Sequence, residues 1–410
     1  MGKTIWIINQ YGSTPNIGIG GRHFYLSMAL AKRGHTVKVI CASSHHLLRQ
    51  YPDVKSDLLE QKIGNVSYIW LKMPRYGGAS DKKRIWNWFK FAAKLPSLHN
   101  KIGSKPDVIL CSSPSLVSFL GAEILARKTG ARIVSEVRDI WPMTLIELGG
   151  YSINHPFIRL LQMVEDRVYR KSDAVISNLK YAVTHMTSRG MDEKKFHWIP
   201  NGFSEEEFNI DEIFVKNFKA LLPDDKLILG YAGTMGRAND LDTIIDAAAL
   251  LQDRTDVAFV LVGDGDLKEA LVNKTKALKL ANIHFYASVP KGKVSSVLDT
   301  FDACLLCWHN SPLYIYGVAA NKLYEYLASG KPLLQSYSGT GDLVNEYEAG
   351  ITVDAQRPDM LANAIRQFSE LSLNQRKKLG SNGRKAAYEN YEYNILGQKL
   401  EHVLLHKRFD

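Results

Sequence analysis

The chain alternates short apolar runs with longer segments in which apolar and polar positions recur every three to four residues. The short runs predict strands and the longer segments predict helices, as in "GGRHFYLSMALAKRG", which ends at Gly34. Strands that alternate with helices of about 10–15 residues are typical of parallel sheets covered on both faces. The predicted strands are "TIWIINQ", "HTVKVICAS", "DVILCSS", "RIVSEVRD" and "DAVISN", and, from about residue 226, "KLILGYAGT", "VAFVLVGDGD", "NIHFYAS", "ACLLCW" and "PLLQSY".

This pattern occurs in two series, which predicts two doubly wound α/β domains facing a cleft. A turn signal at Pro200, Asn201 and Gly202 separates the series. We therefore expect a first domain over residues 1–198 and a second over 199–392, with a helix at about 393–410 packing back on the first. Ligands of such folds bind at the carboxyl ends of the strands.

The composition excludes several protein classes. No run of about 18 apolar residues is present, so no membrane-spanning helix is expected. The chain enters a strand directly at "KTIWIINQYG", without the apolar stretch of a signal peptide, so a cytoplasmic location is expected. Cys304 and Cys307 alternate along a predicted strand, which favours core packing over a metal or redox site.

Charge is distributed unevenly along the chain. Residues 1–200 hold 29 Lys and Arg against 14 Asp and Glu, a net +15, whereas the remainder carries a net −5. A basic half suggests an anionic partner, and no nucleic-acid recognition motif accompanies the charge. The basic aromatic stretch, residues 82–94, combines five cations with four large aromatics. It suits the face of an anionic bilayer, or it covers the first sheet with its aromatics; the charge of this half favours the bilayer.

Three glycines, Gly18, Gly20 and Gly21, precede the first predicted helix. A dinucleotide fingerprint would need a third glycine where His23 stands, and an acid at the end of the second strand, where none occurs. A dehydrogenase is therefore not expected. Two interpretations stay open: a tight turn that lets the helix pack closely, and a loop that offers backbone N–H groups to an anion.

The segment "SPLYIYGVAANKLYEYLASGKPLLQS" closely resembles the donor-binding motif of retaining glycosyltransferases of family 4, which have the GT-B fold. Other segments resemble that family in the same order: the glycine loop, "SEVRDIWP", "WIPNGF", "YAGTMGRANDLDTIIDAA" and "LVGDGD". The likeness covers nearly the whole chain. It is greatest to bacterial surface-polysaccharide enzymes that transfer an amino sugar such as N-acetyl-fucosamine.

The resemblance implies a donor site in the second domain. Glu325 would accept hydrogen bonds from the ribose hydroxyls, and Lys322 and Arg237 would neutralise the departing diphosphate. Gly317 stands where the family often has a first glutamate, so recognition of the donor sugar must differ. The other implied donor-binding residues are Gly20, Gly21, Asn201, Gly233, Ala320, Asn321 and Leu323.

The resemblance also implies that Asp139 lies on the acceptor side, where it could orient or deprotonate the acceptor hydroxyl. The alternatives for Asp139 are pairing with Arg138 and capping a helix. The resemblance implies no protein nucleophile, because the donor's own phosphate oxygen is expected to assist transfer of the acceptor proton. No metal or other cofactor is expected, and Asp266, in "GDGD", is expected to cap a helix. His45 and His46 are expected to be solvated.

The implied activity is transfer of a sugar, with retention, from a UDP-linked donor to a lipid-linked saccharide. The implied setting is O-antigen or capsule synthesis on the inner face of the plasma membrane. Two alternatives stay open. A nucleotide-sugar 2-epimerase of the same fold would need no separate acceptor, and a non-catalytic nucleotide-sugar-binding protein would bind the donor without turnover.

Overall fold

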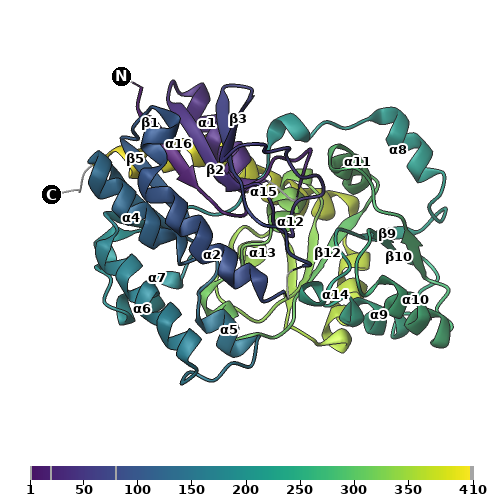
Figure 1. Cartoon of the computed structure of the whole chain (residues 1–410). Coiled ribbons are helices and arrows are strands. Elements are labelled where there is room, and N and C mark those ends of the chain that lie inside the picture. Colours follow the sequence, from purple (N-terminus) through teal and green to yellow (C-terminus); the bar gives the residue numbers. More distant parts are fainter. Residues whose placement is uncertain (1, 19–20, 79–80, 407–410) are drawn as a thin grey trace. The chain divides into compact units, whose positions relative to one another are not determined.

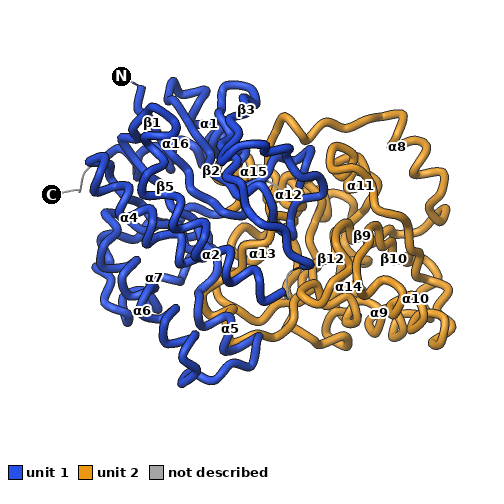
Figure 2. Tube along the Cα trace, in the orientation of Figure 1, with its two compact units in different colours: residues 1–200, 393–410 blue, residues 201–392 orange. Residues whose placement is uncertain are grey.

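The chain folds into two compact units, which Figure 2 shows in blue and orange. The computed structural model describes residues 2–18, 21–78 and 81–406. Unit 1 comprises Met1–Pro200 with Tyr393–Asp410, and unit 2 comprises Asn201–Glu392. The chain therefore passes from one unit to the other between Pro200 and Asn201, inside the predicted turn.

Unit 1 contains an eight-stranded sheet in the order β3-β4-β2-β1-β5-β6-β7-β8 (Figure 1). All neighbouring strands are parallel except β3 and β4, which form an antiparallel hairpin. Our sequence analysis predicted no strand in this region: β3 is a largely polar edge strand, but the apolar and buried β4 was missed as well. The strands are β1 (Thr4–Ile8), β2 (Thr36–Ala42), β3 (Leu58–Ile63), β4 (Val66–Leu71), β5 (Val108–Ser112), β6 (Arg132–Val137), β7 (Ala174–Ser177) and β8 (Phe196–Trp198).

Helices cover this sheet, and the last helix of the chain is one of them. The Tyr25 and Tyr393 rings stack 4.8 Å apart. A Cβ placed on Gly397 would lie 2.4 Å from the Cβ of Ala29, so glycine permits the close packing of α16 on α1. The helices are α1 (Arg22–Lys32), α2 (Lys83–Lys94), η1 (Leu95–Ser97), α3 (Leu98–Ile102), α4 (Ser118–Thr129), α5 (Met143–Glu147), α6 (Pro156–Lys171), α7 (Ala182–Ser188), η2 (Glu193–Lys195) and α16 (Tyr393–Leu405).

Unit 2 contains a six-stranded, fully parallel sheet in the order β11-β10-β9-β12-β13-β14. Its central strands are apolar and buried, as expected for a sheet covered on both faces. Cys304 and Cys307 are buried free thiols on β12, which confirms their core role. The strands are β9 (Leu227–Ala232), β10 (Val257–Val262), β11 (Ile283–Tyr286), β12 (Ala303–Cys307), β13 (Leu333–Ser336) and β14 (Gly350–Val353).

Both units are thus Rossmann-like α/β domains, as the alternating pattern predicted. Within the described part of the chain, no helix combines the length and apolar character needed to cross a bilayer. The helices of unit 2 are η3 (Glu205–Glu207), α8 (Glu212–Lys219), η4 (Arg237–Asn239), α9 (Leu241–Ala249), α10 (Lys268–Ala277), η5 (Lys291–Lys293), α11 (Val294–Asp299), η6 (Pro312–Tyr316), α12 (Asn321–Ser329), α13 (Leu343–Glu346), α14 (Pro358–Glu370) and α15 (Leu373–Asn390).

Candidate donor and acceptor sites

Helix α12 organises the candidate donor site in unit 2. It begins after Ala320, which is extended and provides no side-chain cap, so the first-turn N–H groups of the helix lack a capping partner there. Ala320 and Asn321 are accessible, whereas Leu323 is a core residue whose N–H contacts the Ala320 carbonyl at 3.3 Å. Leu323 could therefore serve a ligand only through its backbone.

Lys322 lies on the first turn of α12 and is held firmly by its neighbours. Its Nζ donates to Tyr231 Oη at 2.6 Å and to Asn239 Oδ1 at 2.5 Å, and it lies 4.4 Å from the centre of the Tyr231 ring. Burial lowers the pKa of Lys322 to about 7, against the opposing effect of Glu325. A Cβ on Gly233 would lie 3.2 Å from Nζ, so glycine leaves room for the ammonium group.

Glu325 lies one turn further along α12, and its side chain is only 15% exposed. Its carboxylate forms an ion pair with Lys291. Glu325 and Lys291 also line a small pocket with Phe203, Ser204 and residues of α11. A ligand that bound the Glu325 carboxylate would compete with an exposed lysine, which is a weak competitor.

The other residues predicted for the donor site lie in separate parts of the structure. Arg237 on η4 is exposed. Asn201 is buried, and its Nδ2 donates to the carbonyl of Ala319, so it supports the segment that leads into α12. Gly21 precedes α1 in unit 1, and Gly20 lies outside the described residues. Unit 2 thus brings Lys322 into contact with the Gly233 loop, and places Glu325 on the same helix.

Asp139 follows β6 at the carboxyl edge of the unit 1 sheet. Among the described residues its side chain has no hydrogen bond or ion pair, and it is exposed. Helix α5 has Pro142 as its N-cap, so Asp139 does not cap it, and no ion pair joins Asp139 to Arg138. The helix-capping interpretation of Asp139 is therefore wrong. The residue is exposed, and its surroundings raise the pKa of its carboxyl by desolvation, against the opposing effect of the Arg138 charge.

Asp264 and Asp266, the acidic pair of unit 2, lie in the loop between β10 and α10. Asp264 accepts the N–H of Gly265 at 2.9 Å. The prediction that Asp266 caps a helix is wrong, because Leu267 is the N-cap of α10 and no side chain caps that helix. In the described ranges, no group of three or more His, Cys, Asp or Glu residues could hold a metal. Metal independence stays a prediction.

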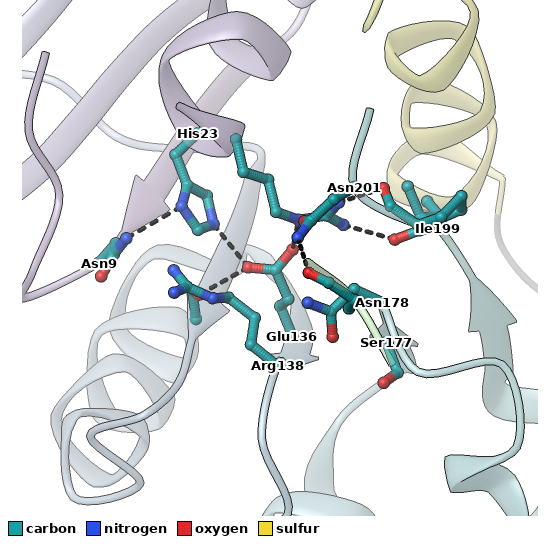
Figure 3. A network of polar contacts seen from close by, with 12 residues as sticks. Asn9, His23, Glu136, Arg138, Ser177, Asn178, Ile199 and Asn201 are labelled. Carbon is teal, nitrogen blue, oxygen red and sulfur yellow. Dashed lines mark hydrogen bonds and ion pairs between the residues drawn. The ribbon is translucent and has the colours of Figure 1, made fainter. Parts of the chain in front are cut away.

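A buried polar network in unit 1 was missed by our sequence analysis (Figure 3). Glu136 on β6 is fully buried and accepts hydrogen bonds from Arg22 Nε at 2.7 Å, from His23 Nε2 at 2.5 Å and from Ser112 Oγ at 2.5 Å. Burial alone would raise the pKa of Glu136, but the hydrogen bond from His23 and the Arg22 charge hold it well below its usual value. The signal was a charged residue within the apolar run "RIVSEV", because a buried charge requires partners.

The network fixes the protonation of His23 and anchors the end of unit 1. Asn9 Oδ1 accepts the N–H of Tyr11, so Asn9 Nδ2 donates to His23 Nδ1 at 2.9 Å. His23 is then neutral and donates through Nε2, which agrees with the lowering of its pKa by burial. Arg22 also donates to the carbonyls of Ile199 and Pro200. It thereby ties α1 to the last residues before unit 2.

The basic aromatic stretch, residues 82–94, forms α2, and part of it covers the core. Trp88 and Phe91 are buried, so the prediction that all four aromatics can meet a bilayer is wrong for these two. Trp86 is 63% exposed and lies near Lys90, whose Nζ is 5.8 Å from its ring. The exposed face of α2 therefore carries Lys83, Trp86 and Lys90.

Comparisons with known proteins agree with this arrangement. Residues 18–202 match the family "Glycosyl transferase 4-like domain", and residues 213–386 match "Glycosyl transferases group 1". A relative from Escherichia coli K12, the "Putative colanic acid biosynthesis glycosyl transferase WcaI", is 24% identical over 82% of this chain and 85% of its own.

Two solved structures show the same fold. Sucrose-phosphate synthase from Thermosynechococcus elongatus superposes with a TM-score of 0.77, at 18% identity and 98% coverage of both chains. Anabaena Alr3699/HepE in complex with UDP and glucose superposes with a TM-score of 0.69, at 15% identity, with 98% of this chain and 99% of that chain covered. With its 4-like domain followed by its group 1 domain, the chain is a glycosyltransferase of the GT-B type.

Proposed function

We propose that this glycosyltransferase transfers a sugar, with retention of configuration, from a UDP-linked donor to a lipid-linked saccharide in bacterial polysaccharide synthesis. The observation that carries the proposal is the first half of α12, which presents uncapped N–H groups, the Lys322 ammonium and the Glu325 carboxylate at one end of unit 2. The complex of HepE with UDP and glucose and the colanic acid relative support it. The sugar proposed is an N-acetylated amino or deoxyamino sugar.

In this proposal Glu325 accepts hydrogen bonds from the ribose hydroxyls, and the N–H groups of α12 face the diphosphate. Lys322 and Arg237 stabilise the negative charge that develops on the leaving diphosphate. Asp139, with its accessible carboxylate, orients or deprotonates the acceptor hydroxyl. The donor's phosphate oxygen assists the same proton transfer, so no side chain acts as nucleophile and no metal is required.

We also propose that the enzyme works on the cytoplasmic face of an anionic membrane. The exposed face of α2 offers cations and Trp86. The following part of unit 1 adds large apolar side chains that are strongly exposed, which is a feature of surfaces that meet partners or lipid. These side chains are Leu148, Tyr151, Ile153 and Met163.

The test is a screen of nucleotide sugars by thermal shift, followed by mass spectrometry with a lipid-diphosphate sugar acceptor. We expect stabilisation by UDP-sugars, and a product one sugar heavier with its anomeric configuration retained by NMR. An isomerised nucleotide sugar formed without acceptor would instead indicate an epimerase. Binding without any product would indicate a non-catalytic protein.

A further inference from the structure

A cluster of aromatic and basic side chains lies at the carboxyl ends of β1, β2 and β4 in unit 1. Tyr11 follows β1, His46 follows β2, and Tyr76 follows β4. The Tyr11 ring lies 5.4 Å from that of His46, whose Nδ1 is 3.0 Å from Tyr76 Oη. Trp88 of α2 donates from Nε1 to Tyr11 Oη at 2.5 Å. Tyr11 and Trp88 are buried, whereas His46 and Tyr76 are partly exposed, so the cluster reaches the surface through His46 and Tyr76 at the end of the sheet where ligands of such folds bind.

Arg84 adds an uncompensated positive charge to this cluster. Its guanidinium lies 5.6 Å from the centre of the Trp88 ring, on the first turn of α2, and it is only partly exposed. Within the described part of the chain, no acid pairs with it: the nearby Asp81 accepts N–H groups of Gly77 and Lys83 instead. Burial and the Arg84 charge both lower the pKa of His46, so the neighbouring histidine does not add a second charge near neutral pH.

The loops that carry the cluster also hold buried polar atoms without partners in the described chain: Gln10 Oε1, Ser13 Oγ and His45 Nδ1. His45 was expected to be solvated, and this is wrong: it is buried and its Nε2 contacts the Gly12 carbonyl at 3.1 Å. Each unpaired buried group costs about 1–3 kcal/mol, so native structures keep few of them without a reason. Three such atoms on two adjacent loops mark a polar region beside the cluster.

The cluster is linked to the segment that we assign to the acceptor. Trp141, two residues after Asp139, packs edge-on against Trp88 with ring centres 5.6 Å apart. The same Trp88 contacts Tyr11 and Arg84. An acceptor hydroxyl near Asp139 and a second acceptor group near Arg84 would thus contact one connected set of side chains in unit 1.

We propose that Arg84, with the hydroxyl of Tyr76, binds a phosphate group of the acceptor. Both residues are partly exposed, and the Arg84 charge acts on Tyr76. A guanidinium near a hydroxyl group provides the donors that phosphate oxygens require, and in the described chain no carboxylate pairs with it. The proposal rests on the proposed transferase function and adds that the acceptor carries a phosphate close to its reacting sugar. Both a lipid diphosphate and a free sugar phosphate supply this chemistry.

The test is calorimetric titration of the full chain with inorganic pyrophosphate in the presence of excess UDP. We compare wild type with Arg84→Gln, and with Lys83→Gln as the matched control on the same turn. Loss of a charged hydrogen-bond partner should raise the pyrophosphate Kd about tenfold or more in Arg84→Gln, and Tyr76→Phe should raise it less. Lys83→Gln should leave the Kd nearly unchanged.

Equal pyrophosphate affinity in wild type and Arg84→Gln, or no binding to wild type, would overturn the proposal. UDP affinity, measured separately, should be the same in all variants; failure of UDP to bind would reject the donor site but not the phosphate subsite. Titration with a short prenyl diphosphate and with a sugar 1-phosphate then distinguishes a lipid phosphate from a free sugar phosphate. If Arg84-dependent binding is tighter for the prenyl compound, the phosphate belongs to a lipid, and if it is tighter for the sugar phosphate, it belongs to a free saccharide.

Discussion

At the scale of single residues, the donor proposal depends most on Glu325. The carboxylate is largely buried beside a pocket, and its ion-pair partner, Lys291, is half exposed. Truncation should cost little stability, because Lys291 is half exposed and can be solvated once the carboxylate is removed. Truncation should weaken donor binding, because a hydrogen bond to a charged group contributes about 1.5–3 kcal/mol.

We expect Glu325→Ala to raise the UDP Kd at least tenfold while the fold is retained, as measured by calorimetry and circular dichroism. Glu269→Ala, which removes an exposed helix glutamate of the same unit, is the control and should bind UDP like wild type. Unchanged UDP affinity in Glu325→Ala would remove Glu325 from the donor site.

The proposed role of Lys322 predicts that donor binding depends on pH. Its pKa of about 7 means that the free enzyme loses this positive charge as the pH rises through neutrality. A terminal phosphate is fully charged above its second pKa of about 6, so the ligand hardly changes in this range. We expect the UDP Kd to rise between pH 7 and 9, by up to about tenfold per unit if binding requires the ammonium form.

The control for this prediction is Lys322→Met, which should bind UDP weakly and with little pH dependence over the same range. Calorimetry in buffers of different ionisation enthalpy should also show proton uptake by wild type above pH 7. A flat pH profile in wild type would mean that the Lys322 charge does not act on the donor.

At the scale of elements, the Glu136 network joins β6, α1 and the last residues before unit 2. Removing one partner of a buried ion pair leaves the other charge uncompensated, which costs about 3–5 kcal/mol. We expect Glu136→Ala to lower the free energy of unfolding of unit 1 by about this amount, measured by urea denaturation. Glu147→Ala, on the exposed side of α5, should change it by less than about 0.5 kcal/mol.

Because the pKa of Glu136 is lowered in the folded protein, the stability that the network provides depends on pH. The network should stabilise the fold fully above the unfolded glutamate pKa, near 4.5. That contribution should be lost only as the pH falls from there through the lower folded value. An unfolding midpoint of Glu136→Ala equal to that of wild type would show that the network is not stabilising.

Element by element, the sequence was most informative where local patterns decide the structure. The apolar strands and amphipathic helices were recognisable, and so was the turn at Pro200, because their periodicities are set by local geometry. The β3–β4 hairpin was not recognised: β3 is a largely polar edge strand, and β4 is apolar and buried but was not identified as a strand. The contacts of Arg22 with Glu136 and with Pro200 join residues 114 and 178 positions apart, and no local pattern reports such a pairing.

The candidate site was predictable to the extent that it follows a family motif. Lys322 and Glu325 were found because they share one short helix. Leu323 and Asn201 fell in matching segments but support the structure through burial and a backbone contact. The burial of His45, Trp88 and Phe91 depends on which elements meet in space, so charge and aromatic content alone misassigned their exposure.

At the scale of the whole molecule, the membrane proposal predicts that the uneven charge orients the enzyme on an anionic surface. Residues 1–200 carry a net +15, and the exposed face of α2 concentrates cations beside Trp86. Each cation close to an anionic leaflet contributes about 1 kcal/mol of attraction, which salt screens. Apolar side chains that insert into the bilayer contribute a part of the binding free energy that salt does not remove. Binding to vesicles should therefore have two separable components.

We expect the protein to sediment with anionic vesicles at low salt, and more weakly as salt rises. Replacing Lys82, Lys83 and Lys90 with Ser should remove the salt-sensitive part, whereas Trp86→Ala combined with Ile153→Ala should reduce the part that persists at high salt. The matched control replaces three exposed lysines of unit 2, Lys276, Lys377 and Lys378, with Ser and lowers the net charge equally. Because that control leaves the α2 face intact, it should keep vesicle binding; equal loss in both triple variants would mean that net charge, and not this face, governs the attraction. Wild type that ignores anionic vesicles at low salt would show that the exposed face of α2 is ordinary solvated surface.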